Sequence, residues 1–146
     1  MALPVQGIKS LFQHPNLGTF IIRASVGAIL ALSGWNKFAA GTGVLEAVGS
    51  NVSRVGLDIG SSGAFPLFFG IMAAGSELLG GILLILGVFF RPMAALLLVT
   101  MGVATITKYE TSSGDFTLYG YPLLMFLVLL GLLFSGSGKY SIVRDS

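Results

Sequence analysis

Three charged residues, Arg23, Lys37 and Glu77, lie within or at the end of long apolar stretches of this sequence. A charge at the centre of a spanning helix costs roughly 2.5–3.5 kcal/mol on insertion scales, so such residues usually face the protein interior and pair, bind ligands or carry protons. The carboxylate of Glu77 can accept protons and hydrogen bonds, whereas Arg23 and Lys37 can donate hydrogen bonds to a ligand oxygen. These three residues are the candidates for a ligand site or a proton-handling site.

The composition of the chain indicates a membrane protein. Of its 146 residues, 54% are apolar and 10% are charged, whereas about a quarter of the residues in soluble domains are charged. The formal net charge of +2 comes without a basic cluster, which argues against nucleic acid as a partner. We therefore expect the partners to include the lipid bilayer and molecules inside it or at its faces.

Four apolar runs are long enough to cross a bilayer, which takes about 20 residues. They cover residues 17–38, 64–90, 92–108 and 118–134. Only Arg91 separates the second run from the third, so these two runs must form an antiparallel hairpin, and Pro92 suits the first turn of a helix. The sequence predicts one membrane domain over residues 1–146, an all-α antiparallel bundle of four transmembrane helices.

An amphipathic helix on the membrane surface is predicted between the first two spans. Within residues 43–63 the charged residues Glu46, Arg54 and Asp58 stand apart from an apolar series at helical spacing, formed by Val44, Val48, Val52, Val55 and Ile59. Such a pattern is typical of a helix that lies in the interface and does not span it.

Helical spacing also places each buried charge on a face of small residues. Glu77 shares its face with Gly70, Ala74, Gly81 and Leu84. Arg23 and Lys37 share theirs with Gly27, Leu30 and Gly34. Small residues allow helices to approach closely, so we expect both faces to point into the bundle.

The depths of Arg23 and Glu77 suggest that the two side chains pair. Counting from the ends of the apolar runs puts Arg23 roughly 6 Å closer to the cytoplasmic side than Glu77, which an Arg side chain can span. Such a pair either fixes the register of two helices without any chemistry, or leaves Glu77 facing a polar pocket where it passes protons or hydrogen-bonds a ligand. The sequence leaves both interpretations open.

Further polar residues gather where the first and third spans reach the outer interface. Trp35, Asn36, Lys108 and Glu110 are candidates for polar contacts there. For Lys108 and Trp35 the simpler interpretation is that the lysine reaches water and the tryptophan anchors the interface. Lys37 shares a face with Arg23, and we expect Arg23, Lys37 and Glu77 to line one polar track from the interface to mid-bilayer.

The distribution of basic residues favours cytoplasmic termini by four to three. Lys9, Arg91, Lys139 and Arg144 fall on the side of the termini, and Lys37, Arg54 and Lys108 fall on the other. Positive charge is retained on the cytoplasmic side of membrane proteins. An aromatic belt is predicted on the outer side, formed by Trp35, Tyr109, Tyr119 and Tyr121.

The chain has no cysteine and a single histidine, His14. Thiolate-ligated iron–sulfur clusters and bis-histidine haem are therefore excluded, and no metal-ligand cluster is expected. We expect no covalently bound cofactor, so any electrons must be carried by a bound molecule. The sequence has no recognisable catalytic arrangement, and whether the chain is an enzyme stays open.

The motifs of the chain resemble those of the DoxX family, small four-helix bacterial membrane proteins related to the DoxD subunit of thiosulfate:quinone oxidoreductase. The resemblance covers about residues 20–141 and rests on Arg23, SGWNK at the end of the first span, SELLGGILLILGVFFRPMA, and the closing GSGKYS. It implies a multi-pass protein of the bacterial cytoplasmic membrane. It also implies either a membrane subunit of quinone-linked oxidoreductases, with membrane or peripheral redox proteins as partners, or an assembly factor for membrane proteins.

Two hypotheses about function follow. In the first, the bundle binds quinone, Lys37 or Arg23 hydrogen-bonds a quinone oxygen, and Glu77 handles the accompanying proton. In the second, the chain is a non-catalytic scaffold or accessory subunit that docks a larger complex, and its buried charges only hold the fold together. A transporter or channel is a weaker third hypothesis, because four short helices form a pore only by oligomerising.

Overall fold

The computed structural model describes residues 14–142. Within this range four helices are long and apolar enough to cross a membrane: α2 (Pro15–Ala39), α4 (Ala64–Leu86), α5 (Phe90–Thr111) and α6 (Phe116–Ser135). Two short helices, α3 (Thr42–Ser50) and the 3-10 helix η1 (Asn51–Val55), follow α2. The all-helical architecture with four spanning helices is confirmed, whereas Lys9 and Arg144 lie outside the described residues.

The spans begin and end a few residues away from the predicted limits. Helix α4 stops at Leu86, earlier than predicted, because Gly87 adopts a left-handed conformation (φ +70°) and the N–H groups of Gly87 and Val88 bond back to the last turn of the helix. Helix α5 starts at Phe90 and continues to Thr111, beyond the predicted residue 108. Helix α2 already starts at Pro15.

Helices α2 and α4 pack against each other through small residues. A Cβ atom added to Gly27 would lie 2.6 Å from the Gly81 carbonyl oxygen, and one added to Gly34 would lie 2.6 Å from the Ala74 carbonyl oxygen. The two backbones therefore touch at two levels, as small residues allow in membrane helices. These contacts fix the antiparallel register of α2 against α4.

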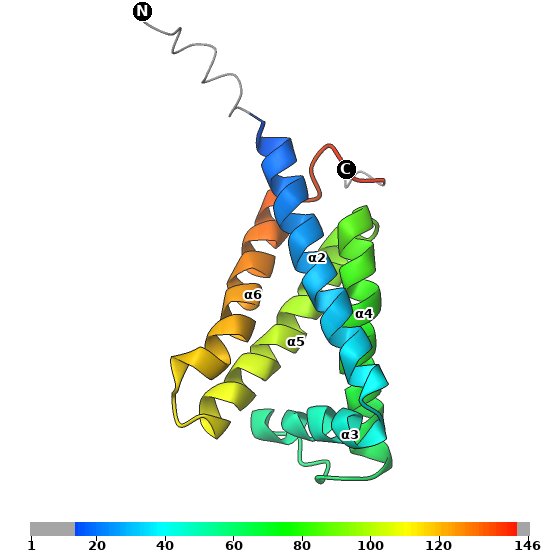
Figure 1. The fold of residues 1–146 in the computed structure, drawn as a ribbon, viewed down its shortest axis with the longest axis vertical. Helices are drawn as coiled ribbons and strands as arrows, with labels where there is room; N and C mark the ends of the chain where they lie inside the picture. The colour runs from blue at the N-terminus through cyan, green and yellow to red at the C-terminus, as the bar shows by residue number, and fades with distance from the viewer. Residues whose placement is uncertain (1–13, 143–146) are drawn as a thin grey trace, which may run out of the picture.

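The short helix α3 lies across one end of the bundle, opposite the end where α2 starts and α6 finishes (Figure 1). It packs on α4, where Leu45 is buried and its backbone meets Gly70. The helical pattern predicted through Ile59 ends sooner, because η1 follows at Asn51 and Gly56 turns left-handed. A placement at the end of the bundle agrees in part with the predicted interfacial helix.

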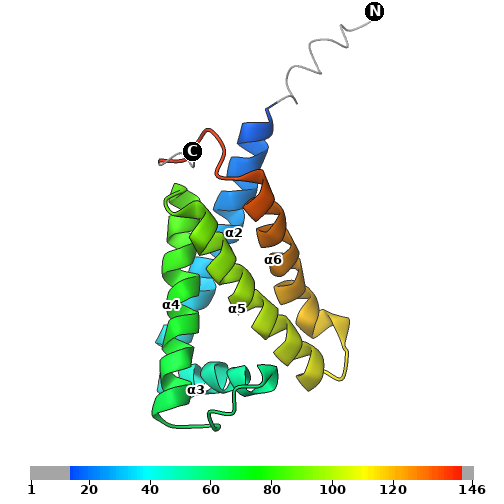
Figure 2. The ribbon, with the colours of Figure 1, turned by 180° about the vertical axis from the view of Figure 1, so that it is seen from behind.

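The apolar core occupies the half of the bundle where α2 starts and α6 finishes. Its buried side chains come from all four spans: Val26, Leu30, Leu84, Phe90, Ala94, Leu97, Met101, Met125, Leu129 and Leu132. Towards the other end the α5–α6 hairpin diverges from α2 and α4, as Figures 1 and 2 show from opposite sides. In that half α6 is separated from α2 in both views.

Candidate functional site

Glu77 lies inside the bundle, 1% exposed, and the described residues that bind its carboxylate come from α2. The ammonium group of Lys37 contacts both carboxylate oxygens, and the hydroxyl of Ser33 donates to Oε2 at 2.9 Å. Ser33 and Lys37 are one turn apart, so both face α4. Together these residues form a charge-neutral cluster, which we call the Glu77 cluster.

The predicted pairing of Arg23 with Glu77 is wrong. The guanidinium of Arg23 is fully buried and donates to the Ser137 carbonyl through Nη1 and to the Tyr140 carbonyl through Nη2, the latter at 2.8 Å. Arg23 therefore holds the segment that follows α6, at the end of the bundle where α2 starts.

The register of α2 against α4 explains this difference. The close contacts of Gly27 and Gly34 with α4 place Glu77 level with Ser33, about ten residues and hence about 15 Å along α2 from Arg23. Helix α2 extends past the end of α4, and Arg23 lies beside Gly87. Apolar runs counted from their ends cannot reveal such an offset, so the single polar track expected from the sequence is divided into two clusters.

The surroundings of Arg23 make it a structural anchor. Its guanidinium lies 5.5 Å from the centre of the Phe20 ring, and that ring packs against Tyr140 with centroids 5.9 Å apart. Its Nε has no partner among the described residues. The two bonds to backbone carbonyls therefore hold the C-terminal segment against the bundle, a role that the sequence alone does not predict.

An open groove runs beside the Glu77 cluster between α2, α3 and α6. Its volume is about 490 Å³, within the range of small-molecule sites. Polar groups enter it from Ser33, Asn36, Lys37 and Tyr121, and the apolar part of its wall comes from Ile29, Leu32 and Val44. A ligand in this groove would meet the lysine of the Glu77 cluster directly.

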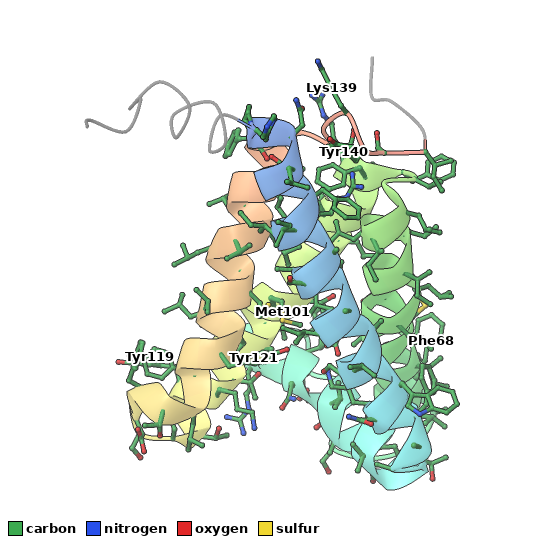
Figure 3. The ribbon with its side chains drawn as sticks, turned by 45° about the horizontal axis from the view of Figure 1, so that its top comes forward. Phe68, Met101, Tyr119, Tyr121, Lys139 and Tyr140 are labelled. Carbon is green, nitrogen blue, oxygen red and sulfur yellow. The ribbon has the colours of Figure 1, made fainter. Side chains whose placement is uncertain are left out.

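Tyr121 is the residue of this site that the sequence does not identify. Its position predicts a place in an interfacial aromatic belt, and the structure adds that Tyr121 lines the groove from α6 while Lys37 lines it from α2. In Figure 3 Tyr121 lies on the side of α6 nearer α2, whereas Tyr119 lies on the opposite side, where it packs on Tyr109 and Phe116. Helix α6 is apolar on all sides, so its sequence does not reveal which side faces α2.

The remaining candidates do not join the cluster. Asn36 lines the groove, while Trp35 projects from α2 and is largely exposed. Lys108 is exposed at the end of α5. Glu110 forms an exposed ion pair with Arg54 of η1 at 3.1 Å, which contributes little to stability. Within residues 14–142 no three His, Cys, Asp or Glu side chains gather in a group able to hold a metal ion.

In a comparison with protein families, residues 18–110 fit the family model described as DoxX. The matched range includes α2, α3, η1, α4 and nearly all of α5, and so contains the whole Glu77 cluster. Comparisons with curated proteins and with solved structures give no match.

Proposed function

Because the chain belongs to the DoxX family, we propose that it is a membrane subunit associated with quinone-linked redox metabolism and that it binds a quinone headgroup in the groove beside Lys37. The observation that carries the proposal is the presence of Lys37 in the wall of an open groove. Quinones are lipid-soluble and carry two carbonyl oxygens on a flat ring. A polar contact with apolar surroundings suits such a ligand.

The residues around the groove have distinct roles in this proposal. The ammonium of Lys37 donates a hydrogen bond to one quinone oxygen, and the Tyr121 hydroxyl donates from the α6 wall. Reduction of a quinone to a quinol takes two electrons and two protons. A partner redox protein supplies the two electrons, the Glu77 cluster passes one proton to the ligand oxygen beside Lys37, and water at the open side of the groove supplies the other proton to the second ligand oxygen.

The second candidate is a non-catalytic accessory subunit of a larger membrane complex. One observation favours it: the Glu77 carboxylate is already satisfied by Lys37 and Ser33, as in a lock between two helices. In that case α3, η1 or the exposed apolar faces of the spans would dock the partner, and the groove would hold ordinary lipid.

We place the protein in the bacterial cytoplasmic membrane with both termini in the cytoplasm. The count of basic residues along the sequence supports this orientation by four (Lys9, Arg91, Lys139 and Arg144, of which Lys9 and Arg144 lie outside the described residues) to three (Lys37, Arg54 and Lys108), because positive charge is favoured on the cytoplasmic side. Four carboxylates belong to the opposite end or its loops: Glu46, Asp58, Glu110 and Asp115. Reporter fusions at each terminus test this orientation, and an extracytoplasmic signal from either would contradict it.

Co-purification tests the quinone proposal. The full chain is extracted from its native membrane in mild detergent, and bound quinone and accompanying polypeptides are quantified by mass spectrometry. We expect near-stoichiometric quinone that Lys37→Met reduces at least tenfold and Glu77→Gln reduces in part, because the lysine is the direct contact. Lys108→Met, at the same end but outside the groove, is the matched control and should leave the quinone unchanged.

The same measurement separates the two candidates. A constant polypeptide partner without quinone, retained in both Lys37→Met and Glu77→Gln, would support the accessory subunit and contradict the quinone site. Loss of quinone in the control as well as in Lys37→Met would indicate general partitioning into the detergent micelle and would also contradict the site.

A further inference from the structure

We propose that the end of the bundle where α2 starts and α6 finishes has a second binding site, which takes a phosphate group from the headgroup of an anionic phospholipid. A polar cavity of about 310 Å³ lies there, lined mainly by Asn16, Arg91, Ser135, Ser137 and Lys139. These residues come from the start of α2, the start of α5, and the end of α6 with the loop after it. Figure 3 shows Lys139 at this end beside Tyr140. The proposal is independent of quinone binding.

The chemistry of the lining suits a phosphate. Arg91 and Lys139 bring two cations, and Asn16 and the two serines add hydrogen-bonding groups. Arg binds phosphate with parallel N–H groups and Lys acts as a point charge. Basic pockets between spanning helices on the cytoplasmic side are typical of anionic headgroup sites.

Hydrogen bonds to α2 hold the loop that forms one wall of the cavity. The Ser137 carbonyl accepts a hydrogen bond from the buried Arg23, and the Lys139 N–H donates to Asn16 Oδ1 at 3.4 Å. The loop turns at Gly136 and Gly138, which have φ values of +76° and +73° and so favour glycine. A wall that is already ordered loses little further freedom when a ligand binds.

A lipid is favoured over free phosphate because the cavity borders surfaces that suit acyl chains. Phe134 precedes Ser135 on α6 and is 82% exposed, and Leu17 follows Asn16 on α2 and is also exposed. Each of these two apolar residues lies one helical position nearer the middle of its span than the polar residue beside it. A headgroup in the cavity would thus leave its acyl chains along apolar helix surface.

Native mass spectrometry of the full chain tests this site with defined lipids. The protein is titrated with phosphatidylglycerol, with phosphatidylcholine of the same acyl chains, and with inorganic phosphate. We expect phosphatidylglycerol to bind more tightly than phosphatidylcholine, and Lys139→Gln and Arg91→Gln each to weaken it about fivefold. Lys139→Arg should retain binding, and Lys108→Gln at the opposite end is the control. Thermal unfolding shows which variants stay folded, and Lys139→Gln, at an exposed loop position, carries the test if Arg91→Gln does not fold.

Each outcome decides for or against the proposal. Selective phosphatidylglycerol binding that Lys139→Gln weakens and inorganic phosphate does not displace supports a lipid site. Binding of inorganic phosphate that displaces the lipid with equal affinity would keep the phosphate chemistry and overturn the lipid as its source. Equal binding of both lipids, or an equal loss in Lys108→Gln, would overturn the site altogether.

Discussion

Removing the Lys37 ammonium should strand the Glu77 carboxylate inside the bundle. Glu77 is 1% exposed, and after Lys37→Met the Ser33 hydroxyl is the one donor left to it within residues 14–142. Breaking one side of a buried ion pair costs about 3–5 kcal/mol in soluble proteins. Two facts reduce this value here: the Lys37 side chain is 24% exposed, and polar contacts between membrane helices contribute less than their burial suggests. We therefore expect Lys37→Met to lower the free energy of unfolding by about 2–3 kcal/mol.

The coupling between the two residues distinguishes an ion pair from two separate effects. In the double variant Lys37→Met/Glu77→Gln neither charge remains, so the loss should be smaller than the sum of the single losses by about 0.5–3 kcal/mol. Arg23→Leu combined with Glu77→Gln should instead be additive within about 0.5 kcal/mol, because the two side chains are about 15 Å apart along α2.

Unfolding of the purified protein in mixed micelles with increasing SDS measures these free energies. Far-UV circular dichroism follows the loss of helix. The fluorescence of Trp35, the single tryptophan, follows local unfolding of α2 near the Glu77 cluster. Additive losses for Lys37 and Glu77, or a strong coupling between Arg23 and Glu77, would refute the pairing of Lys37 with Glu77.

Three further predictions concern the contact between α2 and α4, the Arg23 anchor and the N-terminal cap of α6. Gly34→Ala should lower the melting temperature, because the new Cβ would lie 2.6 Å from the Ala74 carbonyl oxygen. Gly75→Ala is the control: its new Cβ would meet nothing within 4 Å, so the melting temperature should stay unchanged or rise. Arg23→Leu should release the segment 136–142, measured as faster hydrogen–deuterium exchange there, and unchanged exchange would contradict the anchor. Asp115 caps α6 and accepts hydrogen bonds from the N–H and hydroxyl of Thr117, which lower the pKa of its carboxyl. Its stabilising effect is therefore present above the unfolded pKa of about 3.9 and is lost as the pH falls through the lower folded pKa. Melting curves between pH 7 and pH 2 should show a smaller acid destabilisation for Asp115→Asn than for the parent protein.

Local periodicity in the sequence was enough to orient the first two spans. Small residues at three- and four-residue steps predicted that the faces of Arg23 and Glu77 point inwards, and both side chains are buried in the structure. The same is true of Gly27 and Gly34. Which side chains share a face depends only on the periodicity of one helix, so the sequence of that helix is enough to predict it.

The relation between helices could not be predicted from the sequence. The stagger of α2 against α4 depends on which glycine meets which, and the end of α4 at Gly87 depends on a left-handed turn that an apolar run conceals. Ser33 was recognisable in part, because it lies four residues before Lys37 on the same face. The contact of Arg23 with the segment after α6 joins residues more than a hundred positions apart and has no local signal.

Photolabelling with a quinone analogue tests most directly whether the groove beside Lys37 holds a quinone headgroup. The labelled full chain is digested and the modified peptides are identified by mass spectrometry, with excess unlabelled quinone as competitor. We expect competitor-sensitive label on α2 around Ser33–Lys37 and on α6 around Tyr121, lost in Lys37→Met and retained in Lys108→Met. Label spread evenly over the lipid-facing surfaces, or unchanged in Lys37→Met, would contradict quinone binding in this groove.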